Sequence, residues 1–146
     1  MCTCSIKEVN GDLFSADESY SMAHCVAADM RLGKGIAVKF RTKFGQMHTL
    51  KQQEQKPGGV AVLQDKSRFI YYLVTKESSW AKPTYQSLND SLNAMKIHML
   101  KHNINKLAIP RIGCGLDGLV WQKVKNMLHK VFEEVPVEII VYNYVP

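Results

Sequence analysis

The sequence predicts an α/β fold in which helices cover both faces of a mixed β-sheet. The apolar pattern switches repeatedly between strand-like runs and stretches of helical spacing along the 146 residues, and this alternation is typical of α/β layers. Two glycine-rich stretches, 33–35 and 113–115, each lie between a predicted strand and a predicted helix. Because open α/β sheets bind ligands at the carboxyl ends of their strands, these stretches also mark the candidate binding edge.

The first half of the chain contributes four predicted strands and one predicted helix. Residues 5–9 alternate in polarity as a short strand, and the mostly apolar run 22–27 predicts a buried strand. Apolar residues at helical spacing between 36 and 44 predict a helix that ends at Gly45. The β-branched and aromatic runs 60–63 and 69–74 predict a hairpin, and the breaker at 56–59 (KPGG) predicts a turn within one domain.

The second half predicts two further helices and two further strands. The apolar stripe of the longest helix recurs at intervals of 3, 4, 3 and 4, and Thr84 is its candidate N-cap; the stripe consists of Tyr85, Leu88, Leu92, Met95 and Met99. Residues 106–109 form a strand that stops at Pro110. A final helix spans 121–131 and a closing strand spans 138–142. His24, Cys114 and Trp121 are expected to fill packing positions within this fold.

Composition predicts one globular domain, residues 1–146, with residues 1–4 as a mobile tail. Nineteen Lys and Arg against thirteen Asp and Glu give a net charge of +6, which favours an anionic partner: nucleic acid, an acidic membrane or a phosphorylated small molecule. The four cysteines, Cys2 among them, show no zinc-finger spacing, and no apolar run approaches the roughly 20 residues of a membrane span. With no export signal, a reducing compartment is expected, cytosol or nucleus.

The two glycine-rich stretches predict phosphate binding. Glycine allows close approach of the backbone to a ligand, and a helix N-terminus adds partial positive charge. Two such loops facing each other suit a diphosphate. The NTPase pattern GxxxxGK[ST] and the dinucleotide pattern GxGxxG are both absent. Turn and cap glycines are the alternative interpretation of either loop alone.

Four stretches together resemble the macrodomain family: 9–14 (VNGDLF), 23–26 (AHCV), 32–38 (LGKGIAV) and 110–117 (PRIGCGLD). The segments 71–76 (YYLVTK) and 82–85 (KPTY) extend the resemblance to the macrodomains that remove terminal ADP-ribose from proteins and deacetylate O-acetyl-ADP-ribose. It implies a three-layer α/β/α macrodomain with a central mixed, mostly parallel sheet. The family pattern has a serine where this chain has Ala27, which removes one candidate polar contact to the ligand.

The resemblance also implies the roles of individual residues. Asp12 would accept a hydrogen bond from the adenine amino group, next to Leu13, and Tyr142 would lie near the adenine. The diphosphate and the distal ribose would lie between two loops, formed by Gly33, Lys34, Gly35, Ile36 and Ala37 and by Ile112, Gly113, Cys114, Gly115 and Leu116. Lys76 and Asp117 would carry the chemistry.

Each of the three charged candidates also has a structural interpretation. Asp12 fits a turn capped by its own side chain, Lys76 fits a solvated charge, and Asp117 fits an N-cap of the final helix. In the functional interpretation, Lys76 attacks C1″ of the distal ribose as a free amine, with Lys34 and Arg111 as candidate cationic neighbours. Asp117 then transfers protons and resolves the lysyl–ADP-ribose adduct.

The predicted function is therefore hydrolysis of ADP-ribose linked to protein Glu or Asp, together with deacetylation of O-acetyl-ADP-ribose. No cofactor and no metal are expected, the protein is expected to be a monomer, and poly(ADP-ribose) is a further candidate partner. A non-catalytic ADP-ribose reader, an ADP-ribose 1″-phosphatase and, from charge alone, a nucleic-acid-binding domain are the alternatives. The resemblance favours the nucleus over the cytoplasm and implies a role in the DNA damage response.

Overall fold

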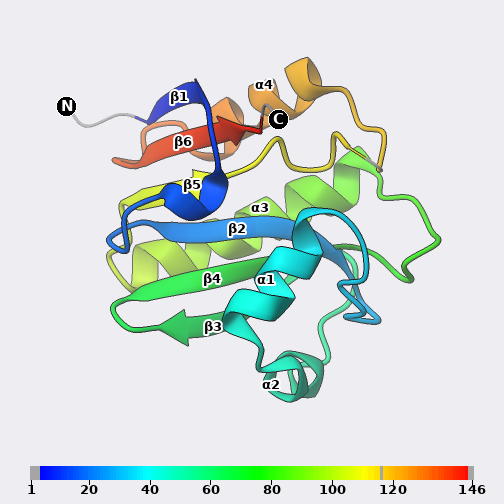
Figure 1. The fold of residues 1–146 in the computed structure, drawn as a ribbon. Helices are drawn as coiled ribbons and strands as arrows, with labels where there is room; N and C mark the ends of the chain where they lie inside the picture. The colour runs from blue at the N-terminus through cyan, green and yellow to red at the C-terminus, as the bar shows by residue number, and fades with distance from the viewer. Residues whose placement is uncertain (1–3, 116, 145–146) are drawn as a thin grey trace.

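The computed structural model describes residues 4–115 and 117–144, which form six strands, four α-helices and one short 3-10 helix (Figure 1). The strands are β1 (Ser5–Asn10), β2 (Ser21–Ala27), β3 (Gly59–Asp65), β4 (Arg68–Lys76), β5 (Lys106–Ile109) and β6 (Glu138–Asn143). The helices are η1 (Leu13–Ser15), α1 (Ile36–Phe44), α2 (Met47–Gln52), α3 (Tyr85–Lys101) and α4 (Trp121–Val131). None of the described helices is long and apolar enough to cross a membrane.

The strands form one mixed sheet in the order β1-β6-β5-β2-β4-β3, confirming the predicted fold class. Every neighbouring pair is parallel except β3 and β4, which form the predicted hairpin. Helices α1 and α2 cover one face of the sheet and α3 and α4 cover the other, so the domain has three layers (Figure 1). Only β3 runs antiparallel, because a two-residue turn returns the chain from it directly to β4.

Each face of the sheet packs against its helices in a separate core. On β4, Tyr71 and Leu73 point toward α3 and α4, whereas Tyr72 and Val74 point toward α1 and α2. This alternation follows from the two-residue period of a strand, and it explains why a strand buried on both faces is apolar throughout. Thr84 caps α3 as predicted: its hydroxyl accepts from the Ser87 N–H at 3.0 Å.

Three local expectations are corrected. The six-residue helix α2 was not predicted, since it is too short to show a helical stripe and starts after Gln46 in the left-handed conformation. Asp117 is not the N-cap of the last helix: α4 begins at Trp121, and Val120 occupies its N-cap. Cys4, expected on a mobile tail, is partly buried and packs against the core, while residues 1–3 lie outside the described part.

The carboxyl ends of the five parallel strands meet at one edge of the sheet. The segments that follow β1, β2, β4 and β5 all begin there, and Tyr142 lies at the end of β6. Residues far apart in the sequence are thus brought to one edge, where an α/β sheet holds its ligand.

Candidate active site

A cavity of about 800 Å³ opens at this edge, within the range of small-molecule sites. It lies between the β2–α1 loop, the end of β4 and the β5–α4 loop. Ten of the predicted site residues line it: Gly33, Lys34, Gly35, Ile36, Ala37, Lys76, Ile112, Gly113, Gly115 and Asp117. The structure therefore brings the two glycine loops and the predicted chemical pair around one space.

The first glycine loop leads directly into a helix. Gly35 is the N-cap of α1 and has φ 60° and ψ −144°, a conformation that is almost restricted to glycine. Met30 and Leu32, both buried, also have positive φ. The unusual backbone is held by this packing, and it presents the N-terminus of α1 to the cavity, where an anion would be stabilised.

The second glycine loop does not open a helix directly, contrary to expectation. The Leu119 N–H donates to the Gly113 carbonyl at 2.8 Å, so the chain closes on itself before α4 begins. Gly113 has φ 74°, and a Cβ there would lie 2.8 Å from Leu119 Cδ1. Gly113 is thus required both by backbone conformation and by space.

Lys76 and Asp117 form an ion pair inside the cavity. Lys76 Nζ donates to Asp117 Oδ1 at 2.6 Å, and the two side chains are only 15% and 16% exposed. Lys76 is the last residue of β4, and Asp117 is placed by the folded β5–α4 loop. A short bond between charged groups in a partly buried site is stronger than its exposed equivalent. The Lys76 amine and the Asp117 carboxylate are therefore placed within direct proton-transfer distance of each other.

Four other predicted residues do not line the cavity. Leu13 is buried in the core on the α1 side, and Cys114 donates to the Ile112 carbonyl at 3.2 Å from within its loop. Burial raises the pKa of the Cys114 thiol to about 11, in keeping with a packing role. Asp12 lies two residues after the end of β1, and Tyr142 lies near the end of β6, the strand that pairs with β1. Leu116 lies outside the described residues.

Asp12 is exposed, whereas a carboxylate that selects adenine through its exocyclic amino group is expected to be buried. Its Oδ1 accepts from the Phe14 N–H at 2.9 Å, so it caps η1, as its structural interpretation predicted. Gly11 lies against the ring of Tyr142. Asp12 and Tyr142 thus lie at the same edge of the sheet as the cavity.

A family model described as Macro domain matches residues 23–128 of the chain. The chain belongs to the macrodomain family. It is 50% identical over 138 residues to the human ADP-ribose glycohydrolase OARD1, covering 94% of this chain and 91% of that protein. It is 28% identical to a DNA ADP-ribosyl glycohydrolase of Mycobacterium tuberculosis, covering 91% of this chain and 40% of that protein.

Solved structures agree on the fold of this macrodomain. The macrodomain of Thermus aquaticus DarG superposes with a TM-score of 0.85 at 21% identity, covering 95% of this chain and 98% of that one. Thermosipho africanus DarTG, solved in complex with ADP-ribose, superposes with a TM-score of 0.82 at 20% identity, covering 95% and 41%.

The macrodomain cavity has further lining residues that the sequence did not single out. Asp29 accepts from the Ser79 N–H at 2.7 Å and from the Ser79 hydroxyl, and it also accepts from the Arg31 N–H at 3.1 Å. Burial by itself would raise the pKa of Asp29, but these hydrogen bonds outweigh it and hold that pKa below its usual value. The carboxylate ties the β2–α1 loop to the segment after β4. Asp-to-Ser contacts 50 residues apart leave no local sequence signal.

His24 also lines the cavity but belongs to the core. Its ring stacks on Phe40 with centroids 3.7 Å apart, and neither ring nitrogen has a hydrogen-bond partner among the described residues. Burial lowers the pKa of His24 to about 3, so the ring stays neutral and supplies an apolar wall.

Arg111 lines the cavity, and its guanidinium contacts Glu8 and Trp121. Glu8 lies 3.5 Å from its guanidinium and accepts from Trp121 Nε1 at 2.9 Å and from Lys125 Nζ at 2.8 Å. The guanidinium also lies over the Trp121 ring, 5.7 Å from its centroid. Trp121 is packed against the core as expected and has the additional role of orienting Arg111.

Proposed function

We propose that this macrodomain hydrolyses ADP-ribose from protein Glu and Asp side chains, using Lys76 as nucleophile and Asp117 as acid and base, and that it deacetylates O-acetyl-ADP-ribose. The macrodomain is a hydrolase of ADP-ribose linkages, and the 50% identity with a named ADP-ribose glycohydrolase supports this class. The observation that carries the finer proposal is the Lys76–Asp117 pair, 2.6 Å apart within the cavity.

The pair fits a two-step displacement. With ligand bound, Asp117 takes a proton from the Lys76 ammonium, and the free amine attacks C1″ of the distal ribose. The bond between C1″ and the carrier's ester oxygen breaks, and the carrier leaves as a carboxylate. Water then attacks C1″ of the lysyl adduct and loses a proton to solvent, and Asp117 returns its own proton to the departing amine. Before substrate binds, the Lys76 amine is engaged in its contact with Asp117.

The rest of the cavity suits the diphosphate. The α1 N-terminus at Gly35 provides backbone N–H groups, and Lys34, Arg31 and Arg111 supply positive charge around the same space. Asp12 and Tyr142, at the same edge of the sheet, are proposed to receive the adenine. A carboxylate there would favour a base with an exocyclic amino group.

A release assay on matched variants tests this proposal. A protein carrying glutamate-linked ADP-ribose is incubated with wild type, Lys76→Ala, Asp117→Asn and the control Lys101→Ala, whose lysine is exposed on α3. Wild type and Lys101→Ala should release ADP-ribose. Lys76→Ala should bind free ADP-ribose by calorimetry yet release none, and Asp117→Asn should release it at least 100-fold more slowly, the low end of acid–base catalysis.

Other outcomes favour the alternatives. If wild type binds ADP-ribose without releasing it, the macrodomain is a reader. If it instead liberates phosphate from ADP-ribose 1″-phosphate, it is a phosphatase. Undiminished release by Asp117→Asn would disprove the assignment of that residue, because asparagine cannot act as a base.

A further inference from the structure

The net positive charge of the chain is concentrated in one segment. Residues 30–58 contain seven Lys or Arg and one acidic residue, Glu54, and so account for the whole formal charge of +6. The remainder of the chain contains twelve basic and twelve acidic residues and is neutral. This segment forms the β2–α1 loop, α1, α2 and the turn before β3.

All seven basic residues are exposed: Arg31, Lys34, Lys39, Arg41, Lys43, Lys51 and Lys56. Among the described residues, no carboxylate lies within ion-pair distance of any of them, although Lys66, Arg68, Lys76, Arg111 and Lys125 all have such partners elsewhere in the fold. A local excess of positive charge creates a field that attracts polyanions. We call these seven residues the α1–α2 basic surface.

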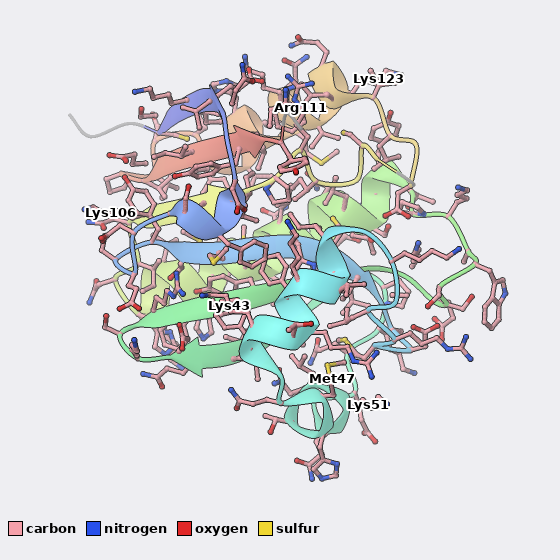
Figure 2. All side chains as sticks on the ribbon, viewed as in Figure 1. Lys43, Met47, Lys51, Lys106, Arg111 and Lys123 are labelled. Carbon is pink, nitrogen blue, oxygen red and sulfur yellow. The ribbon has the colours of Figure 1, made fainter. Side chains whose placement is uncertain are left out.

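Two exposed aromatic rings lie at the borders of the α1–α2 basic surface, each beside one of its cations. Arg31 lies over Trp80, 5.9 Å from the ring centroid, and Lys39 lies over Tyr144 at 5.2 Å. Trp80 is 77% exposed and Tyr144 is 64% exposed. Figure 2 shows Lys43 and Lys51 on the α1–α2 layer, apart from Lys106 and Lys123.

We propose that the α1–α2 basic surface binds a single-stranded nucleic acid, with its cations on the phosphates and Trp80 and Tyr144 stacked on bases. Cations interleaved with exposed aromatic rings are the pattern that single strands require, since their bases are free to stack. An acidic membrane fits less well, because Val38, at 41%, is the only large apolar side chain in residues 30–58 counted as exposed. The surface shares Arg31 and Lys34 with the cavity, but nucleic-acid binding does not require hydrolysis, and Lys39, Lys43 and Lys51 do not line the cavity.

Two charge-matched triple variants test the location of the site. Lys39→Gln/Lys43→Gln/Lys51→Gln removes three cations of the α1–α2 basic surface, and the control Lys7→Gln/Lys101→Gln/Lys130→Gln removes three exposed cations elsewhere. Binding of a fluorescein-labelled 20-nucleotide oligouridylate is measured by anisotropy between 50 and 200 mM salt. Calorimetry with free ADP-ribose verifies that both variants remain folded.

The first variant should lose about 100-fold in affinity near 0.1 M salt, and its log–log salt slope should be shallower by about 2, at roughly 0.7 per lost phosphate contact. Tyr144→Ala should weaken binding about 10-fold, within the range for loss of one stacked base. The charge-matched control should bind as wild type does, apart from a small uniform loss.

Equal losses in both triple variants would overturn the proposal, because net charge rather than this surface would then explain binding. Tight binding of poly(ADP-ribose) together with no measurable binding of the oligonucleotide would also overturn it. Neither outcome would affect the release assay on Lys76 and Asp117, so the two proposals fail separately.

Discussion

Gly113→Ala should weaken both the fold and the cavity. The new Cβ would sit at φ 74° and 2.8 Å from Leu119 Cδ1. A left-handed conformation costs a non-glycine residue roughly 1–2 kcal/mol, and displacing the half-buried Leu119 from its rotamer adds about 0.5 kcal/mol or more. The expected loss is thus about 2 kcal/mol, or a fall in Tm of roughly 4–8 °C for a chain of this size.

The assay is thermal unfolding of Gly113→Ala beside Gly115→Ala. Gly115 lies in the same loop, but its φ is not in the left-handed region and a Cβ there would meet nothing within 4 Å. The control should stay within about 0.5 kcal/mol of wild type. Since Gly113 lines the cavity, its variant should also bind ADP-ribose more weakly by calorimetry. An unchanged Tm for Gly113→Ala would refute the reasoning from backbone conformation.

Three further predictions concern other parts of the same domain. The pKa of His24 is about 3 in the folded protein and 6.5 when the ring is exposed. Below pH 6.5 unfolding therefore takes up a proton, and the free energy of unfolding falls by up to about 1.4 kcal/mol per pH unit toward pH 3. Between pH 7 and pH 5, urea unfolding should show a smaller fall for His24→Leu than for wild type. Asp29→Asn weakens the hydrogen bonds to Ser79 and should reduce the affinity for ADP-ribose measured by calorimetry. The control Asp17→Asn, remote from the cavity, should leave the affinity unchanged. Equal affinities of the two variants would argue that the Asp29–Ser79 hydrogen bonds do not shape the cavity. Thr84→Ala removes the cap of α3 and should cost about 1 kcal/mol in urea unfolding while ADP-ribose affinity stays unchanged.

Strong local patterns made most of the fold predictable. The stripe from Tyr85 to Met99 identifies α3 because its spacing spans four turns, and Thr84 supplies a local start signal. The helix α2 escaped prediction because six residues hold too few apolar positions for a period to show. The bounds of α4 were predicted correctly, but Asp117 was a wrong candidate for its N-cap because nothing in residues 113–118 reveals that the loop closes on itself through Gly113 and Leu119.

The site was predictable only in part, for a different physical reason. The glycine loops can be recognised from local sequence. Lys76 and Asp117 are 41 residues apart, and they meet only because β4 and the β5–α4 loop reach the same edge of the sheet. Residue types alone would leave Lys76 among fourteen other lysines. The family resemblance selected Lys76, and the structure places its Nζ 2.6 Å from Asp117 Oδ1. The clamp between Asp29 and Ser79 had neither a local pattern nor a resemblance to reveal it.

The covalent adduct on Lys76 is the most direct test of the account. Wild-type protein is mixed with a glutamate-linked ADP-ribosylated protein and quenched early in turnover with cyanoborohydride, which reduces the open-chain imine form of the lysyl adduct. The product is analysed by peptide mass spectrometry. We expect ADP-ribose on the peptide that contains Lys76, and not on the one containing Lys34, which lines the same cavity. Release of ADP-ribose with no adduct, or with the adduct on Lys34, would contradict it.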